Sequence, residues 1–375
     1  MDGGMDTIWL TCPKGLTAQL CAEVRALGYE VVAEHPAAVE TYGTIEDCMR
    51  FNLHLRTAHR VLLKLEEASC RDADELYEVA LAIPWENYFT IDDYVSITST
   101  VRNDTIRDTR FANLKCKDAL VDRFWGKFAA RPDTGPLRDR GVVFFFWLDD
   151  QVSFYLDTSG ESLCHRGYRK QPGEAPMRET LAAACGLETG WTGEGNFINP
   201  MCGSGTLAIE AALIATGTPP GMLRDAFGFQ HLKGFDEAKW QSLRSEIPVK
   251  SFSGRILASD INPAVLEAAR MNAAAAGVED VIEFSVQDFR EHEVPEGGGV
   301  FFFNPPYGER MGDHTELEGI YKDIGDFLKQ RATGYTGWVF TGNIRMLKRV
   351  GLRPGAKRVL YNGAIECRLA DYAMY

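Results

Sequence analysis

The tetrapeptide Asn304-Pro305-Pro306-Tyr307 follows the apolar run Val300–Phe303, which is typical of a buried strand. Two prolines make a rigid turn, so the Asn304 side chain and the Pro305 carbonyl are held at the edge of the predicted sheet. An exocyclic amine on a nucleobase is a poor nucleophile, because its lone pair is delocalised into the ring. Two acceptors on its two hydrogens would favour a tetrahedral, nucleophilic nitrogen, and the Tyr307 ring can stack on the base. The pattern predicts a catalytic site for such an amine, whereas a turn that only caps a strand is the alternative.

A glycine-rich segment from Asn199 to Thr206 lies between a predicted strand and a predicted helix. Gly203 and Gly205 let a ligand approach the backbone, and a helix N-terminus favours negative charge. The string from Gly203 onward also fits GxGxx[GA], the dinucleotide fingerprint. That fingerprint needs an acid about 20 residues further on, at the end of the second strand. Here the second strand ends only at Asp260, so an NAD enzyme is a minor alternative.

Two aspartates follow the next two predicted strands, at 255–259 and 281–286. Asp260 can accept both hydroxyls of a ribose, and Asp288 can accept from an adenine amino group. A single aspartate at a strand end is more often a helix cap than a ligand. Together with the glycine-rich segment, these aspartates give three loops at the carboxyl ends of strands in one sheet. Such an arrangement rarely arises by chance, and it predicts a shared ligand site.

Strands and helices alternate from residue 177 to the end of the chain, which predicts an α/β fold with a mostly parallel sheet and helices on both faces. The predicted strands are 196–199, 255–259, 281–286, 299–303 and 337–341, and the predicted helices are 177–186, 205–215, 263–276 and 315–332. An Asn362-Gly363 turn predicts a final hairpin, which would close the sheet with an antiparallel edge.

The N-terminal half mixes short strands and helices, and its most informative element is a predicted helix at 115–130. An apolar stripe on this helix is expected to pack on a sheet, and a basic stripe at the same spacing suits RNA phosphates. The apolar stripe is Leu120, Phe124 and Phe128, and the basic stripe is Arg123, Lys127 and Arg131. A solvated helix face with no ligand is the alternative.

The composition of the 375 residues, with 45% hydrophobic and 25% charged, is that of a globular protein and excludes global disorder. No apolar run reaches the ~20 residues of a membrane span, and the N-terminus lacks the features of a secretory signal. The nine cysteines form no CxxC pair, which predicts no metal site and favours the reducing cytoplasm. The net charge of −13 conceals a basic region at 102–140 with a net charge of +4, so an RNA partner stays open.

These motifs resemble the S-adenosylmethionine and catalytic motifs of class I amino-methyltransferases, and 117–124 resembles a THUMP RNA-binding domain. Together they resemble the THUMP-containing RNA guanine-N2 methyltransferases over nearly the whole chain, and they are similar to the N-terminal methyltransferase half of the bacterial large-subunit rRNA enzyme. The resemblance implies a ferredoxin-like piece at 6–43, a THUMP domain at 44–158, a linker at 159–176 and a Rossmann-like domain with a seven-stranded sheet at 177–375.

The resemblance also implies site residues. Catalysis would involve Asn304, Pro305 and Tyr307. S-adenosylmethionine would contact Asn199, Pro200, Gly203, Gly205, Thr206, Asp260, Ile261, Asp288, Phe289 and Asn304. RNA would contact Lys117, Arg123, Lys127, Arg131, Arg166 and Arg169. The family often has Asp at position 199, where the carboxylate meets the methionine ammonium, so Asn199 is expected to weaken cofactor binding by ~1–2 kcal/mol.

The resulting expectation is methyl transfer from S-adenosylmethionine to guanine N2, in 23S rRNA. A tRNA guanine-N2 enzyme is the first alternative, because the same domain layout serves tRNA. A DNA adenine methyltransferase shares the Asn-Pro-Pro-Tyr turn but does not explain the N-terminal half. A non-catalytic RNA-binding protein is a further alternative, which the intact 304–307 motif disfavours. The oligomeric state and the target guanosine are left open.

Overall fold

The computed structural model describes residues 5–170, 177–248, 250–307 and 314–375, and it divides into two compact units. The first unit contains 1–12, 20–163 and 224–246, and the second contains 13–19, 164–223 and 247–375. The return of 224–246 to the first unit was not anticipated from the sequence. Residues 171–176, the last six of the expected linker at 159–176, lie outside the part of the chain that the structure describes.

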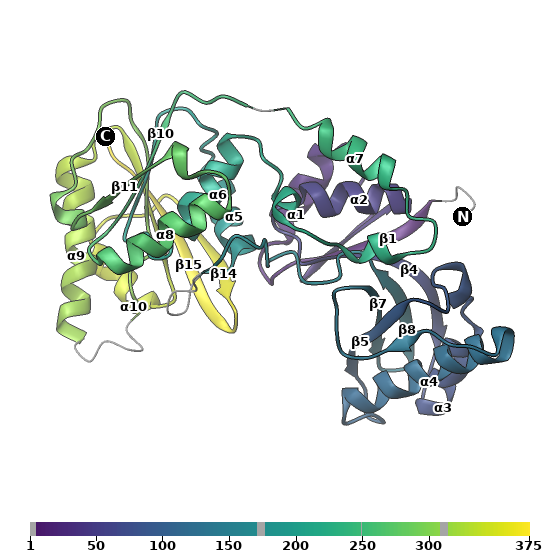
Figure 1. Ribbon diagram of the computed structural model, residues 1–375. Helices are drawn as coiled ribbons and strands as arrows, with labels where there is room; N and C mark the ends of the chain where they lie inside the picture. The colour runs from purple at the N-terminus through teal and green to yellow at the C-terminus, as the bar shows by residue number, and fades with distance from the viewer. Residues whose placement is uncertain (1–4, 171–176, 249, 308–313) are drawn as a thin grey trace. The chain divides into compact units, whose positions relative to one another are not determined.

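In the described part of the first unit, eight strands form one sheet in the order β2-β3-β1-β4-β8-β7-β5-β6. Figure 1 labels β1, β4, β5, β7 and β8 of this sheet. The strands are β1 Asp6–Thr11, β2 Ala33–His35, β3 Ala38–Gly43, β4 Arg60–Ser69, β5 Tyr94–Arg102, β6 Asp133–Thr134, β7 Gly141–Leu148 and β8 Gln151–Asp157. The helices are α1 Thr17–Ala26, α2 Ile45–His54, α3 Ala73–Ala82, α4 Thr109–Phe128 and α7 Glu237–Ser245. Strong caps set the helix starts: the Thr44 and Asp47 side chains form a capping box before α2.

Helix α4 begins earlier and ends earlier than the sequence indicated. The Asp108 side chain caps its first turn, and the left-handed Ala129 (φ 51°) ends it. Leu120 and Phe124 are fully buried as expected, but Phe128 is 52% exposed, so the expectation of a three-residue buried stripe was wrong. The reason is that Phe128 lies in the last turn of a helix that ends before residue 131.

In the second unit, seven described strands form a sheet in the order β11-β10-β9-β12-β13-β15-β14. The strands are β9 Asn196–Pro200, β10 Arg255–Asp260, β11 Ile282–Val286, β12 Gly299–Phe303, β13 Tyr335–Thr341, β14 Lys357–Asn362 and β15 Ile365–Ala373. The first five pair in parallel, whereas β15 pairs antiparallel with β13 and β14. The predicted mostly parallel, seven-stranded sheet with an antiparallel edge is confirmed.

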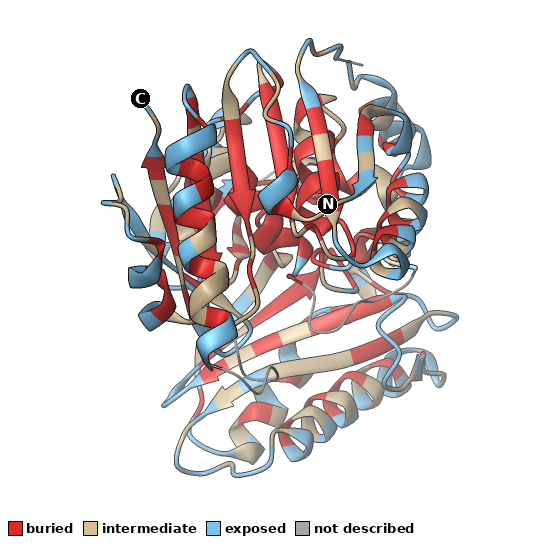
Figure 2. Cartoon of the chain, turned by 90° about the vertical axis from the view of Figure 1, so that its left-hand side faces the viewer, coloured by how far each residue is buried: buried red, intermediate tan, exposed pale blue. Residues whose placement is uncertain are grey.

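The helices of the second unit cover both faces of this sheet. They are α5 Glu179–Glu188, α6 Thr206–Ala215, α8 Pro263–Ala275, α9 His314–Arg331 and α10 Ile344–Leu347. Figure 1 shows α5, α6 and α8 on one side of the strands and α9 on the other. The central strands β9, β12 and β13 are largely buried (Figure 2), and Phe301, Phe303, Tyr321 and Leu328 belong to one hydrophobic core between the sheet and α9.

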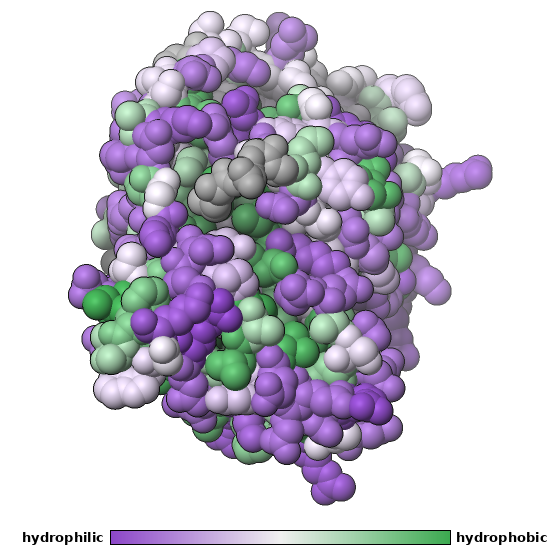
Figure 3. Space-filling view, turned by 90° about the vertical axis from the view of Figure 1, so that its right-hand side faces the viewer, coloured by the Kyte–Doolittle hydropathy of each residue, from purple (hydrophilic) through white to green (hydrophobic). Residues whose placement is uncertain are grey.

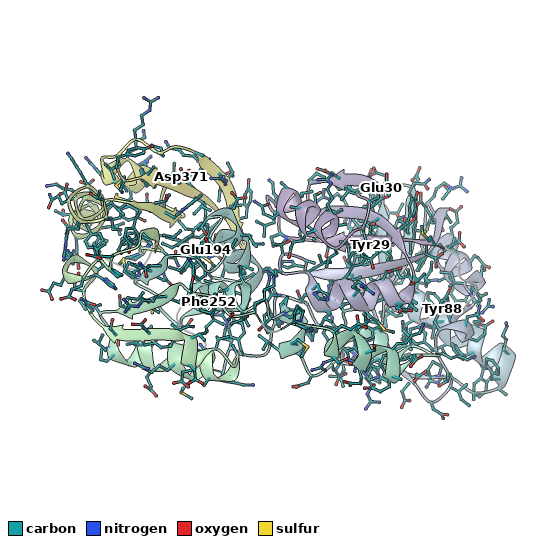
Figure 4. All side chains as sticks on the ribbon, turned by 90° about the horizontal axis from the view of Figure 1, so that it is seen from above. Tyr29, Glu30, Tyr88, Glu194, Phe252 and Asp371 are labelled. Carbon is teal, nitrogen blue, oxygen red and sulfur yellow. The ribbon has the colours of Figure 1, made fainter. Side chains whose placement is uncertain are left out.

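The closing hairpin of β14 and β15 turns at Gly363, whose φ of 64° suits the expected Asn-Gly turn. Asp371 on β15, labelled in Figure 4, accepts a hydrogen bond from the Ala356 N–H over 2.8 Å and thus fixes the start of β14. Among the described residues, no helix combines the length and the apolar character that crossing a membrane requires.

Candidate active site

The loop between β9 and α6 is tied to the end of β10 by two backbone donors. Cys202 N–H donates to Ser259 O over 2.9 Å, and Gly203 N–H donates to Asp260 Oδ2 over 3.0 Å. Gly203 (φ 56°) and Gly205 (φ 82°) both have left-handed backbones, which favour glycine. A Cβ on Gly203 would meet no heavy atom within 4 Å, so the loop has an open side that a ligand can approach.

Asp260 lies at the carboxyl end of β10, as predicted, and both of its carboxylate oxygens accept backbone hydrogen bonds. Oδ2 accepts from Gly203 N–H, and Oδ1 accepts from Asn262 N–H over 3.0 Å. Each carboxylate oxygen has a further lone pair, so these contacts orient the group and leave capacity for a ligand hydroxyl. The next residue, Ile261, is 68% exposed, which leaves its side chain available to cover a flat ligand ring beside Asp260.

Asn199 near the end of β9 is almost fully buried and has one polar atom without a partner. Its Nδ2 donates to the Phe302 carbonyl over 2.9 Å, which fixes the orientation of the amide. Its Oδ1 is buried and has no hydrogen-bond partner among the residues that the structure describes. A buried acceptor without a donor costs free energy, so this atom is suited to a ligand that brings an N–H.

Two further cofactor candidates, Asp288 and Phe289, follow β11 and differ in their surroundings. Asp288 caps the short helix at Phe289–Glu291 and forms an ion pair with Arg290 over 2.9 Å, with its side chain 25% exposed. Phe289 is only 5% exposed, and its ring packs edge-on against Phe303 and Phe327. The Phe289 ring is part of the hydrophobic core, so a cofactor contact of this residue would have to come from its backbone, and the assignment stays a prediction.

Asn304, Pro305 and Tyr307 follow β12 directly, between the ends of the neighbouring strands β9 and β13. The Tyr307 hydroxyl donates to Asn304 Oδ1 over 3.1 Å. Asn343, just after β13, donates through Nδ2 to the Tyr307 carbonyl over 3.0 Å. Burial raises the pKa of the Tyr307 hydroxyl, so the phenol stays protonated and can act as this donor. The turn is therefore held from two strand ends.

Two residues after β13, Gly342 and Asn343, support this turn and were not predicted from the sequence. A Cβ on Gly342 would lie 2.9 Å from Tyr307 Cδ2, so the ring needs a glycine there. The ring also meets Phe340 edge-on, with centroids 6.3 Å apart. The signal that could have found Gly342 and Asn343 is the one used for the other loops, namely their position at the carboxyl end of the next parallel strand.

Arg166, expected to bind RNA, is buried instead. Its side chain is 1% exposed, and its Nε donates to Glu210 Oε1 over 3.1 Å. The Tyr168 hydroxyl donates to the same oxygen over 3.1 Å. The RNA assignment of Arg166 is wrong, because a guanidinium enclosed with its carboxylate partner cannot reach a phosphate.

Arg123, also expected to bind RNA, is paired within the first unit. Its Nε and Nη2 donate to the two oxygens of Glu86 over 2.7 and 2.8 Å, and its Nη1 donates to the Leu81 carbonyl over 2.9 Å. Lys127 contacts the same carboxylate. These hydrogen bonds, with that from Arg123 largest, lower the pKa of Glu86 to about 2. The predicted basic stripe is therefore neutralised in part, and Arg123 attaches α4 to the segment after α3.

Three other RNA candidates, Lys117, Lys127 and Arg131, are more accessible. Lys127 is 48% exposed, and Lys117, 32% exposed, pairs with Asp118 over 3.0 Å. Arg131 is exposed but lies beyond the end of α4, so it does not share the helical stripe as expected. Figure 3 shows one face of the chain as mostly hydrophilic with several small hydrophobic patches. Exposed hydrophobic side chains on α4 include Phe111, Leu114 and Trp125.

Comparison with known families agrees with this architecture. A model described as the RMKL-like methyltransferase domain matches residues 166–371, a ferredoxin-like domain model named for RlmL matches 7–62, and a THUMP domain model matches 70–135. The first match spans more than half of the chain. The chain belongs to the RMKL-like methyltransferase family, and the expected ferredoxin-like, THUMP and class I methyltransferase fold types are confirmed, whereas the expected domain bounds stay a prediction.

Among curated relatives, the ribosomal RNA large subunit methyltransferase K/L of Psychromonas ingrahamii is 40% identical over 98% of this chain and 50% of its own. The protein of the same name from Syntrophotalea carbinolica is 38% identical over 96% of this chain and 53% of its own. The chain thus spans about half the length of these relatives.

Among solved structures, SMU.472, a candidate methyltransferase complexed with SAH, has a TM-score of 0.88 and 28% identity over 100% of this chain and 99% of that chain. A methylase candidate from Clostridium difficile 630 has a TM-score of 0.90 and 29% identity, over 99% of each chain.

Proposed function

We propose that this chain transfers a methyl group from S-adenosylmethionine to the N2 amine of a guanosine in RNA, in 23S rRNA. The observation that carries the proposal is the position of the Asn304 turn at the end of β12. In the sheet, β12 lies next to β9, and β9 lies next to β10. The turn with the amine acceptors and the loops with the cofactor candidates therefore meet at one edge of the sheet, as methyl transfer between two bound molecules requires.

The residues at this edge fit S-adenosylmethionine. The unpaired Asn199 Oδ1 can accept from the methionine ammonium, and Asp260 can accept from the ribose hydroxyls. The exposed Ile261 can cover the adenine, and Asp288 can accept from its amino group. The open side of Gly203 admits the cofactor close to the backbone. When bound, the cofactor supplies an electrophilic methyl group on a sulfonium.

The chain's own residues would prepare the nucleophile. Asn304 Oδ1 and the Pro305 carbonyl would accept the two amino hydrogens, which favours the tetrahedral form of the nitrogen. The hydrogen bond from Tyr307 fixes which end of the Asn304 amide carries the oxygen. No general base is required, because the methylated nitrogen is cationic and acidic and its proton can pass to water.

The RNA would be held by the first unit. The THUMP match at 70–135 includes α4, whose accessible cations are Lys117 and Lys127. The K/L relatives are named for the large ribosomal subunit, which supports 23S rRNA over tRNA as the substrate. This activity would place the chain in the cytoplasm, as its cysteine usage suggested.

Mass mapping of modified nucleosides tests this proposal. We expect cells without the chain to lose one N2-methylguanosine from 23S rRNA, and purified chain with S-adenosylmethionine to restore it. Restoration should fail with Asn304→Ala, which serves as the matched inactive protein. Loss of N2-methylguanosine from tRNA alone would show that the substrate is tRNA and not 23S rRNA. No loss from either RNA would refute the proposal.

A further inference from the structure

Arg169 lies shortly before α5, and three acceptors hold its guanidinium. Nε donates to Glu179 Oε1 over 3.2 Å, and Nη2 donates to the Met177 carbonyl over 2.9 Å. Nη2 also donates to Thr206 Oγ1 over 3.2 Å. Glu179 begins α5, whereas Thr206 is the first residue of α6. The guanidinium therefore joins the start of α5 to the end of the glycine-rich loop.

These contacts use three of the five N–H groups of the guanidinium. The other two are on Nη1, which is buried and has no hydrogen-bond partner within the described ranges. The whole side chain is 15% exposed. A buried charged donor without an acceptor costs free energy, and a ligand that supplies an acceptor would remove that cost on binding.

The surroundings of Arg169 favour an anion. Arg169, Arg178 and Glu179 line a cavity of about 330 Å³. Thr206 opens the first turn of α6, and the residue before it, Gly205, provides no side-chain cap for the N–H groups there. A helix start with open N–H groups attracts negative charge, and two guanidinium groups outweigh one carboxylate.

A second buried atom without a hydrogen-bond partner among the described residues is Asn199 Oδ1. It is an acceptor, whereas Arg169 Nη1 is a donor. Asn199 lies in β9 at the start of the glycine-rich segment, and Thr206, which contacts Arg169, lies at its end as the first residue of α6. The methionine end of S-adenosylmethionine is a zwitterion with one ammonium and one carboxylate. Asn199 Oδ1 can accept a hydrogen bond from the ammonium, and Arg169 Nη1 can donate one to the carboxylate.

We propose that Arg169 is a cofactor-binding residue that recognises the carboxylate of the methionine end through Nη1. This inference rests on the proposed function and adds a specificity-determining contact to it. In the sequence analysis, the family resemblance placed Arg169 among the RNA contacts. The structure instead places its unpaired N–H groups in a buried position beside α6.

Calorimetry with two probes tests this assignment. The probes are S-adenosylhomocysteine and its decarboxylated analogue, which keeps the amine and lacks the carboxylate. For Arg169→Ala we expect about a ten- to hundredfold rise in the Kd for S-adenosylhomocysteine, the cost of losing a charge-assisted hydrogen bond. The Kd for the decarboxylated analogue should change by less than about twofold, because that probe never made the contact.

Arg349→Ala is the matched control, because Arg349 is an exposed arginine of the same unit that pairs with Glu318 on α9 and does not line this cavity. It should leave both affinities within about twofold of wild type. If Arg169→Ala does not fold, Arg169→Lys keeps the charge and should still raise the Kd for S-adenosylhomocysteine selectively.

Three results would overturn the inference. An equal loss for both probes would make Arg169 only a structural link between α5 and α6. Unchanged cofactor affinity with weaker RNA binding would show that Arg169 contacts RNA phosphates and not the cofactor. Failure of the wild-type chain to bind S-adenosylhomocysteine would instead refute the proposed function itself.

Discussion

The Tyr307 hydroxyl donates a hydrogen bond to Asn304 Oδ1, the atom expected to hold an amino hydrogen of the substrate. Both residues belong to the same turn after β12, and the Tyr307 carbonyl is fixed in turn by Asn343. The sequence indicates a stacking role for the tyrosine ring and none for its hydroxyl. The structure gives the hydroxyl a task, because an amide that can rotate by 180° would present its N–H₂ group to the amine in place of its oxygen.

Tyr307→Phe should therefore lower kcat by about five- to tenfold, the effect of losing one neutral hydrogen bond. The KM for RNA should stay nearly constant, because the ring is retained. Single-turnover kinetics at saturating RNA and cofactor measure this change. Tyr361→Phe is the control, since the Tyr361 hydroxyl bonds to Glu366 on the hairpin. A wild-type rate for Tyr307→Phe would show that the hydroxyl does not position Asn304.

Gly342→Ala should disturb the same turn from the neighbouring strand. The added Cβ would lie 2.9 Å from Tyr307 Cδ2 and 2.8 Å from Ile365 Cγ2, so the ring must move. We expect kcat to fall at least tenfold, while the affinity for S-adenosylhomocysteine changes little. Gly319→Ala in α9 is the control, because a Cβ there meets nothing within 4 Å and should stabilise the helix by about 0.5–1 kcal/mol. Equal activity of both variants would contradict the packing argument.

The fold and the strand-end loops were predictable from sequence for a physical reason. Each strand of a parallel sheet is bounded by turn residues, and all carboxyl ends lie on one edge, so Asp260 and Asn304 could be brought together without coordinates. Side-chain partners were not predictable in this way. Arg166 and Glu210 are 44 residues apart and pair only because the chain before α5 packs along α6. A basic residue in a loop has the same sequence signal whether it faces solvent or a buried carboxylate.

Substitution of Asp260 should weaken the binding of S-adenosylmethionine by ~2 kcal/mol or more, because the ribose hydroxyls lose a charged acceptor. Asp260→Ala also removes the acceptors for Gly203 N–H and Asn262 N–H, so the melting temperature should fall as well. Asp260→Asn keeps an amide oxygen for one of these donors and separates the two effects. Calorimetry gives the affinity, and thermal unfolding gives the stability. Unchanged affinity in both variants would remove Asp260 from the site.

Arg123→Ala should reduce the free energy of unfolding in a pH-dependent way. The pKa of Glu86 is lowered in the folded chain from 4.5 to about 2, chiefly by its hydrogen bond with Arg123. A lowered pKa stabilises the fold above the unfolded value, so the contribution is complete above about pH 5 and is lost as the pH falls toward 2. Solvent screening limits it to about 1–2 kcal/mol. Urea unfolding from pH 6 to pH 3 should show the difference from wild type shrinking, whereas the exposed Arg131→Ala shows little difference at any pH. A difference that is constant with pH would mean that the Glu86 pair is not its source.

Asn304→Ala tests the chemical step most directly. The hydrogen bond from the amino group to Oδ1 strengthens as the nitrogen leaves planarity, so it stabilises the transition state more than the bound substrate. We expect kcat to fall by roughly 10²–10³, the effect of losing one preorganised polar contact to developing charge. The affinity for S-adenosylhomocysteine should hardly change, because the Gly203 and Asp260 contacts lie on other loops.

The Tyr307 hydroxyl also loses its acceptor in this variant, so the double variant with Tyr307→Phe should be no slower than Asn304→Ala alone. Single-turnover rates of the two single variants and the double variant form the required cycle. A near-wild-type rate for Asn304→Ala would show that the turn after β12 only caps the strand, and additive losses in the double variant would show that the hydroxyl acts independently of Asn304.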